Sequence, residues 1–250
     1  MKPNLEIVAF DLDDTLTLSR APLDEEMAEL LCRLLAIKKV AVISGASFEQ
    51  FKKQFIGRLT CVDLNLKNLL ILPTSGASLY GYDGEWKQIY SHNLSEAERQ
   101  KIFSAFDQVF KDTNFEMPEK IYGALVEDRG SQVTFSGLGS EAPLTLKTSW
   151  DPTHERRKKL AEALKKYLPD FAVSIGGATS IDVTKRGIDK AYGLQQLLGY
   201  AHLKPENLLY VGDALFPGGN DASVLGLGVE VASVGEPGLE DTKQLITSLL

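Results

Sequence analysis

The chain begins with an apolar run that ends abruptly in carboxylates. Residues 7–10 read Ile-Val-Ala-Phe, which is typical of a buried strand, and three of the next four residues are Asp11, Asp13 and Asp14. Clustered carboxylates repel one another and are costly to desolvate, so a cation among them would stabilise the cluster. Mg²⁺ prefers oxygen ligands from carboxylates and phosphates. The pattern indicates either a metal site at the end of a core strand or a charged turn, where aspartate is common.

Strands and helices are predicted to alternate through the first third of the chain. Apolar residues recur at helical spacing over 27–35, and buried-type strands follow at 40–43 and 69–72. The alternation returns towards the C-terminus, with a helical pattern over 192–198 and a strand at 208–211. Strand–helix–strand units of this length favour an α/β fold with a doubly wound, mostly parallel, Rossmann-like sheet.

The middle of the chain has a different pattern. Asp83-Gly84 is a strong hairpin signal, and a capping-box sequence and several short strand patterns follow it. We therefore expect an α+β domain over 84–186, inserted into a core domain formed by residues 1–83 and 187–250.

The composition is that of an ordinary globular protein with an acidic balance. The 250 residues carry a formal net charge of −7, which argues against nucleic acid as a partner because phosphate backbones attract basic surfaces. No apolar run reaches membrane-spanning length and the N-terminus lacks a signal pattern, so we expect a cytoplasmic protein with no membrane partner. The two cysteines, Cys32 and Cys61, are expected to be reduced core thiols.

Further polar signals stand at the ends of the predicted core elements. Ser44-Gly45 and Asp213 each follow a predicted strand, as Asp11 does, and Lys190 stands at the start of a helical pattern. In open parallel sheets, ligands bind beyond the carboxyl ends of the strands, so these residues could converge. Each of them alone is better explained as a strand end or a solvated charge. Their joint occurrence favours a shared site.

Together these side chains suit phosphoryl transfer, which needs positioning and neutralisation of charged oxygens. Asp11 and Asp213 can hold Mg²⁺, with the backbone carbonyl of Asp13 as a further ligand. Asp11 can attack phosphorus to form an aspartyl phosphate, while Asp13 protonates the leaving oxygen and later deprotonates water. The groups that can bind phosphoryl oxygens are the Ser44 hydroxyl, the Gly45 N–H and the Lys190 ammonium.

These residues resemble the motifs of the haloacid dehalogenase (HAD) superfamily of phosphohydrolases and phosphotransferases. Its motifs are matched, in order, by Asp11–Thr15 for DxDx(T/V), Ser44, Lys190, and Asp213 with Asp221. The resemblance spans nearly the whole chain, and the insertion resembles a C2-type cap of subfamily IIB. It implies that Asn220 and Asp221 lie next to the metal ligands without binding the metal themselves, and that Asp221 orients metal-bound water.

Within that subfamily the chain is most similar to the eukaryotic-type phosphomannomutases. The segments 176–183 and 187–190 and the Pro-Gly-Gly-Asn-Asp run ending at Asp221 resemble the corresponding mutase segments. Two arginines also match mutase arginines, and the matched strand would contact the sugar or its phosphate. The residues that this resemblance places at the substrate are Arg20, Arg129, Ser180 and Asp182.

The chain also departs from the mutase pattern. Asp14 stands where the mutases usually have glycine, and Ser140 stands where they have a cap arginine. Another mutase arginine falls near Ile121, with only Lys120 close by, and the acidic residues of an additional cation site are not evident around 225–230. Serine cannot replace a guanidinium in gripping phosphate at either end of a bisphosphorylated sugar. These departures favour a phosphatase over a mutase.

We therefore expect a Mg²⁺-dependent phosphomonoester hydrolase that acts through an aspartyl phosphate on a small phosphorylated metabolite, with sugar phosphates as the expected class. The alternative is a phosphomannomutase-like phosphotransferase that interconverts hexose 1- and 6-phosphates. A non-catalytic phospho-binding module is a third possibility, which the intact pair of Asp11 and Asp13 disfavours. The chain is expected to act as a monomer or a homodimer.

Overall fold

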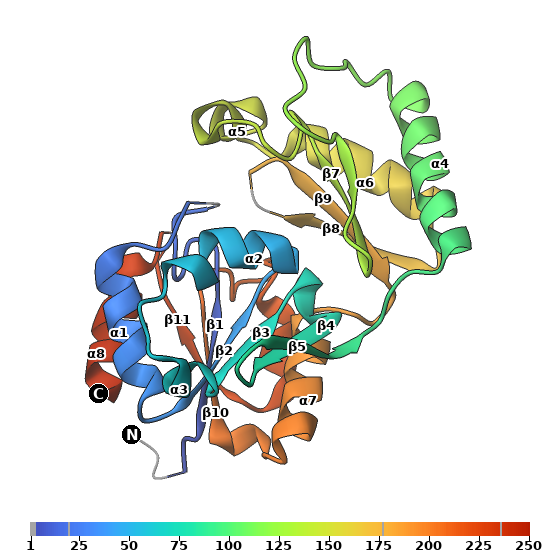
Figure 1. Cartoon of the computed structure of the whole chain (residues 1–250). Helices are drawn as coiled ribbons and strands as arrows, with labels where there is room; N and C mark the ends of the chain where they lie inside the picture. The colour runs from blue at the N-terminus through green and yellow to red at the C-terminus, as the bar shows by residue number, and fades with distance from the viewer. Residues whose placement is uncertain (1–3, 20, 177, 236) are drawn as a thin grey trace. The chain divides into compact units, whose positions relative to one another are not determined.

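The computed structural model describes residues 4–19, 21–176, 178–235 and 237–250. The chain divides into two compact units (Figure 1). The core unit comprises Met1–Ser91 and Asp189–Leu250, and the cap unit comprises His92–Ile188.

The core unit is built on a seven-stranded sheet. Its strands are β1 (Ile7–Asp11), β2 (Lys39–Ile43), β3 (Leu69–Leu72), β4 (Ser78–Tyr82), β5 (Trp86–Ser91), β10 (Leu208–Gly212) and β11 (Glu230–Ser233). They lie in the order β11-β10-β1-β2-β3-β4-β5. The five strands from β11 to β3 run parallel, and β4 and β5 add an antiparallel hairpin at one edge.

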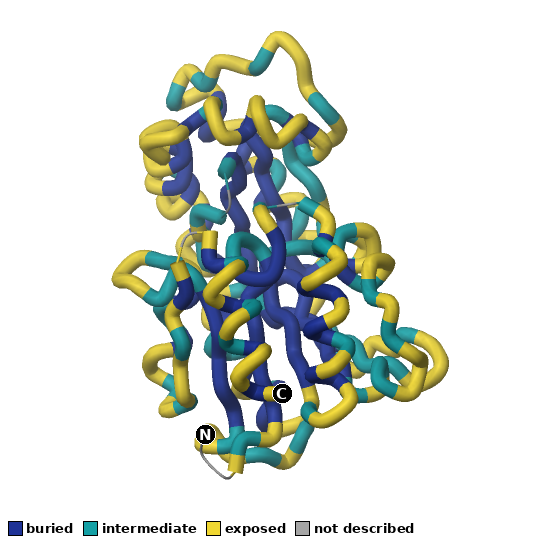
Figure 2. Tube along the Cα trace, turned by 90° about the vertical axis from the view of Figure 1, so that its left-hand side faces the viewer, coloured by how far each residue is buried: buried dark blue, intermediate teal, exposed yellow. Residues whose placement is uncertain are grey.

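Helices cover both faces of this sheet. The α-helices are α1 (Glu25–Leu35), α2 (Phe48–Gln54), α3 (Asp63–Leu66), α7 (Lys190–Ala201) and α8 (Leu239–Leu249), and the 3-10 helices are η1 (Ile56–Arg58), η2 (Thr74–Gly76), η3 (Pro205–Asn207) and η4 (Ala222–Leu227). Because side chains alternate along a strand, Val8 and Phe10 of β1 pack with α1 and α8, while Ile7 and Ala9 pack with α7. Strands β1, β3 and β10 are accordingly buried throughout their length, and β2 is buried after Lys39 (Figure 2). This arrangement confirms the doubly wound, mostly parallel α/β core.

The cap unit is an α+β sandwich of one sheet and helices. Its strands are β6 (Val126–Asp128), β7 (Gln132–Ser136), β8 (Phe171–Gly176) and β9 (Ser180–Lys185), and its helices are α4 (Glu96–Asp112), α5 (Leu144–Trp150) and α6 (Glu155–Tyr167). The strands form an antiparallel sheet in the order β6-β7-β9-β8. Apolar residues at alternate positions of β7 and β9, such as Phe135 and Ile181, pack with α4 and α6. The residues between them are polar.

The boundaries of the cap unit differ from the expected range of 84–186. The hairpin at Asp83-Gly84 forms as predicted, but β5 pairs with β4, opposing Trp86 to Tyr82. Because β4 also pairs with β3, both strands of this hairpin extend the core sheet. The second unit therefore begins only at His92 and continues to Ile188.

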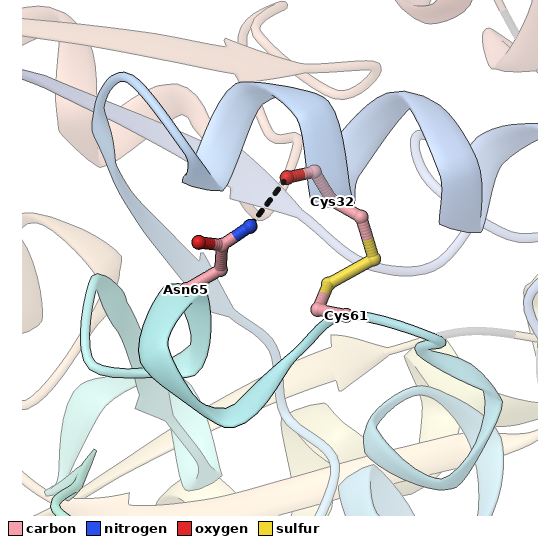
Figure 3. Close-up of a disulfide and its surroundings, with 3 residues drawn as sticks. All are labelled: Cys32, Cys61 and Asn65. Carbon is pink, nitrogen blue, oxygen red and sulfur yellow. Dashed lines mark hydrogen bonds between the residues drawn. A yellow bond between two sulfur atoms is a disulfide. The ribbon is translucent and has the colours of Figure 1, made fainter.

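The expectation of reduced thiols is wrong, because Cys32 and Cys61 form a disulfide (Figure 3). Cys32 lies on α1, and Cys61 lies shortly before α3, which packs against α1 and brings the two Cα atoms to 5.1 Å. The Asn65 side chain of α3 also donates a hydrogen bond to the Cys32 carbonyl. Composition alone could not show this proximity.

No helix in the described part of the chain is long and apolar enough to cross a bilayer.

Candidate active site

The carboxyl ends of three parallel strands bring predicted site residues to one edge of the core sheet. β1 ends at Asp11, Ser44 directly follows β2, and Asp213 directly follows β10. The register pairs Asp11 with Ile43 of β2, so these strand ends are level. Parallel pairing therefore gathers residues that are far apart in the sequence.

Lys190 joins this edge from the first position of α7. The helix begins there because the Asp189 carboxylate accepts a hydrogen bond from the Tyr192 N–H and caps the helix. The Lys190 Nζ lies 2.7 Å from Asp11 Oδ1 and 2.5 Å from Asp221 Oδ1. All three side chains are buried. The ammonium therefore bridges the acidic turn and the late Gly-Asp loop.

Asp221 is held by several donors. The Tyr210 hydroxyl donates to its Oδ1, and the Ala214 N–H donates to its Oδ2 at 3.1 Å. A Cβ on Gly212 would come within 2.4 Å of Asp221 Oδ2, so only glycine fits there. Asn220, which precedes Asp221, is exposed. The sequence reasoning missed Tyr210, because a tyrosine within an apolar strand pattern resembles a core residue.

Burial and neighbouring charge set the protonation of this cluster. Burial raises the pKa of Asp11 well above its usual value, against the opposing attraction of Lys190. Burial also raises the pKa of Asp213, and the nearby Asp221 raises it further. Burial by itself lowers the pKa of Lys190, but Asp11 and Asp221 outweigh it and keep the ammonium charged. A single lysine thus faces a surplus of negative charge.

The donor set suits a divalent cation. Asp11, Asp213 and Asp221 each offer an oxygen, and these oxygens lie within 4.8 Å of one another. With Lys190 neutralising one charge, an oxygen-only site of net negative charge matches the preference of Mg²⁺. Both oxygens of Asp221 already accept hydrogen bonds. Of the three carboxylates, Asp221 is thus held by the largest number of protein donors, while Asp11 and Asp213 lie at the ends of β1 and β10.

Asp13 lies beside this cluster. Its Oδ2 accepts a long hydrogen bond of 3.5 Å from the Ser44 hydroxyl, and its Oδ1 accepts from Gln54 Nε2 at 3.2 Å. The Ser44 Oγ also accepts from the Ala46 N–H at 3.1 Å. Asp13 is only partly buried, and a positioned carboxylate of this kind can exchange protons with a ligand. The predicted metal contact through its backbone carbonyl stays a prediction.

Asp14 shapes the acidic turn. Its φ of 60° lies in the left-handed region, and its Oδ1 accepts from the Ser19 N–H at 3.1 Å. Aspartate and glycine are among the residues that adopt this conformation most readily. Aspartate here is therefore compatible with the backbone geometry that a glycine would adopt.

The predicted substrate residues of the cap unit lie on or near its sheet. Ser180 and Asp182 are buried on β9. Arg129 lies between β6 and β7, and its Nε and Nη2 pair with Glu127 Oε2 at 2.9 Å and 2.8 Å. Arg20, which was predicted to join them, lies outside the described residues.

A buried lysine lies next to Ser140, the position where the mutases have a cap arginine. Lys147 of α5 is only 4 % exposed, and its Nζ donates to the Ser140 carbonyl at 3.0 Å. The sequence reasoning missed Lys147, because a lysine in a short helix resembles a solvated charge. The cap unit therefore has a lysine side chain beside Ser140.

Solved structures share this fold. A Plasmodium falciparum IMP-nucleotidase with bound IMP has a TM-score of 0.73 at 16 % identity, covering 99 % of this chain and 68 % of that chain. A Streptococcus mutans protein has a TM-score of 0.65 at 16 % identity, covering 98 % of both chains. Likeness at these identities shows the fold alone. Fold and strand-end site together define a phosphoryl-transfer enzyme of the HAD superfamily with an inserted cap.

Sequence relatives narrow the class further. The sequence model of the eukaryotic phosphomannomutase family matches residues 27–250. A probable phosphomannomutase of Caenorhabditis elegans is 27 % identical over 98 % of this chain and 95 % of its own length. Phosphomannomutase 2 of Dictyostelium discoideum is 30 % identical over 87 % of this chain and 86 % of its own length. The chain belongs to the eukaryotic phosphomannomutase family, which confirms the resemblance drawn from its motifs.

Proposed function

We propose that this protein is a Mg²⁺-dependent phosphotransferase that interconverts hexose 1- and 6-phosphates, as a phosphomannomutase does. The observation that carries the proposal is the buried bridge from Asp11 through Lys190 to Asp221, in a chain that the mutase family matches over 27–250. The relatives favour this alternative over the phosphatase that we expected from the sequence.

The chemistry follows from the geometry of the core unit. Asp11 attacks the phosphorus and takes the phosphoryl group as an aspartyl phosphate, while the ester oxygen leaves. Asp13 gives a proton to that oxygen and takes one from the hydroxyl that attacks next. The Ser44 hydroxyl, the Gly45 N–H and the Lys190 ammonium would hold the phosphoryl oxygens. Water in place of the sugar hydroxyl would give hydrolysis, so the two activities share these steps.

A Mg²⁺ ion, when bound, would neutralise charge on the transferring phosphoryl group. Asp11, Asp213 and the backbone carbonyl of Asp13 would hold it. Asp221 and its neighbour Asn220 would support these ligands from behind, and Thr15 would orient Asp213 through the hydrogen bond of 3.2 Å between their side chains. The proposed ligands are Asp11, Asp13 and Asp213.

The cap unit would bind the rest of the substrate. A hexose phosphate offers hydroxyls and an anionic group, which suit the side chains of Ser180 and Asp182 and the guanidinium of Arg129. Arg20 is assigned by resemblance alone. The sequence argument against a mutase rested on the replaced cap arginines, at Ser140 and near Ile121, because serine cannot grip phosphate as a guanidinium does. Lys147 beside Ser140 weakens that argument.

Product analysis separates the two activities. We expect mannose 1-phosphate, Mg²⁺ and a catalytic amount of glucose 1,6-bisphosphate to yield mannose 6-phosphate faster than free phosphate. Phosphate release that matches the loss of substrate would establish a hydrolase instead. Binding of the substrate without either product would indicate the phospho-binding module.

Matched variants test the nucleophile. Asp11→Asn should abolish both products, because an amide cannot form the acyl phosphate. Asp170→Asn is the control, since this carboxylate is exposed and pairs with Lys101 on the surface of the cap unit. Undiminished turnover in Asp11→Asn would show that the nucleophile is assigned wrongly.

A further inference from the structure

One face of the cap sheet carries a row of buried polar side chains. Along β7 and β9 the apolar residues point to the helices, so the residues between them share the opposite face. Cross-strand pairing places Gln132 opposite Thr184, Thr134 opposite Asp182 and Ser136 opposite Ser180. These six residues are at most 9 % exposed. A fold that needed only stability would gain more from apolar groups at such positions.

Hydrogen bonds within this row converge on one carboxylate. Gln132 Nε2 donates to Thr134 Oγ1 at 2.8 Å, and Thr134 Oγ1 donates to Asp182 Oδ1 at 2.8 Å. A hydroxyl has a single proton, and the Gln132 amide occupies an acceptor position on the Thr134 oxygen, so the proton points to Asp182. The order of donors fixes the rotation of the Asp182 carboxylate.

The second oxygen of Asp182 lies over a glycine. A Cβ on Gly176 of β8 would come within 2.9 Å of Asp182 Oδ2. The Gly176 carbonyl accepts from Arg157 Nη1 at 3.4 Å, and Arg157 Nε in turn pairs with Asp151 Oδ2 at 3.0 Å, both side chains being buried. The backbone beside Oδ2 is therefore held in place, and a side chain at position 176 would collide with this oxygen.

We propose that Gln132 and Thr134 are positioning residues that aim the Asp182 carboxylate at adjacent hydroxyls of a sugar ring, with Gly176 clearing the space for them. This inference rests on the proposed function for the class of substrate. Asp182 repels a phosphate group and accepts hydrogen bonds from hydroxyls, so it would recognise the hydroxyls of the sugar and not its phosphate. The two successive hydrogen bonds from Gln132 to Thr134 and from Thr134 to Asp182, called the relay below, make this carboxylate rigid before binding. Rigidity before binding strengthens each hydrogen bond that the carboxylate accepts from a ligand.

Binding measurements test the relay without requiring turnover. Dissociation constants would be measured by calorimetry for mannose 1-phosphate and for phenyl phosphate, which shares the phosphate and lacks the hydroxyls. Thr134→Val keeps the shape and removes the hydroxyl. We expect it to weaken mannose 1-phosphate binding by about tenfold and to leave phenyl phosphate binding unchanged. Thr134→Ser should restore the wild-type value.

Two further variants probe the same geometry from other sides. Gly176→Ala leaves both hydrogen bonds intact but displaces Asp182 Oδ2, so it should also weaken only mannose 1-phosphate binding. Thr184→Val is the matched control, since its hydroxyl donates to the Ile188 carbonyl and it lies on the same buried face. It should change neither constant.

The outcomes separate this inference from the proposed function. If Thr134→Val weakened the binding of both ligands equally, or weakened the binding of neither, the relay would be overturned. A wild-type protein that binds mannose 1-phosphate no better than phenyl phosphate would also overturn it. If the protein releases phosphate and forms no isomer, the mutase proposal fails while the binding test still decides the relay. In active protein, Thr134→Val should raise KM about tenfold and leave kcat unchanged.

Discussion

The hydroxyl of Tyr210 donates a hydrogen bond to Asp221 inside the core unit, and both side chains are fully buried. Burial raises the pKa of Tyr210 well above its usual value, and the Asp221 charge raises it further, so the phenol keeps its proton. Tyr210 on β10 thus donates a hydrogen bond to the loop that carries the last acidic motif. The Tyr210 ring packs in the core, while its hydroxyl holds the Asp221 carboxylate of the site.

Tyr210→Phe removes this hydrogen bond and keeps the ring. We expect the free energy of unfolding to fall by about 1–3 kcal/mol, since a buried carboxylate loses a donor. Turnover should also fall, because Asp221 is less firmly held next to Lys190. Urea denaturation and initial rates measure the two effects. Tyr200→Phe on the exposed side of α7 is the control, and an unchanged stability of Tyr210→Phe would contradict the prediction.

Mg²⁺ should stabilise the folded protein through the carboxylate cluster. An ion that binds only the folded state adds about 2.7 kcal/mol at a hundredfold excess over its Kd. We expect the Tm to rise with MgCl₂ in the wild type and to rise much less in Asp213→Asn. NaCl at equal ionic strength controls for screening. The same rise with both salts would remove the evidence for a metal site.

The buried pair of Asp151 and Arg157 should make the stability of the cap unit depend on pH. Burial by itself raises the pKa of Asp151, but hydrogen bonds from the Arg157 side chain and backbone outweigh it and lower the pKa below its usual value. A lowered pKa contributes stability that is complete above the unfolded value, about pH 4, and is lost as the pH falls through the folded value.

The difference between wild type and Asp151→Asn isolates this contribution. We expect it to reach about 3–5 kcal/mol at neutral pH, because the variant leaves Arg157 buried without its counter-charge. It should shrink below about pH 4. Urea denaturation followed by the fluorescence of Trp150, which lies on α5 of the same unit, measures it. A difference that is constant between pH 3 and pH 7 would contradict the assignment.

The disulfide should stabilise the core unit. Cys32 and Cys61 are 29 residues apart, and closing a loop of this length in the unfolded chain corresponds to about 3–4 kcal/mol in the chain-entropy model. We expect dithiothreitol to lower the Tm of the wild type. Cys61→Ser should have a similarly low Tm that the reductant leaves unchanged. A wild-type Tm that does not respond to the reductant would show that the bond does not contribute.

Local patterns predicted much of the core and its site. The apolar run before Asp11, the short strand before Ser44 and the Gly-Asp after the strand at 208–211 were all recognisable, because strand ends carry polar residues at the ligand-binding edge. The family resemblance rested on the same residues. The preference for a phosphatase arose because replaced arginines are visible in a sequence, whereas Lys147 next to Ser140 is not.

The amino-acid sequence by itself determined the elements, their doubly wound order and the carboxylates at the strand ends, because these depend on periodicity and on neighbours within a few residues. Only the tertiary structure decided which distant side chains meet. It joined Thr15 to Asp213 and Cys32 to Cys61, placed the Tyr210 hydroxyl on Asp221, and turned Thr134 towards Asp182. Such contacts depend on how strands and helices pack across long sequence separations, and no local pattern records that packing.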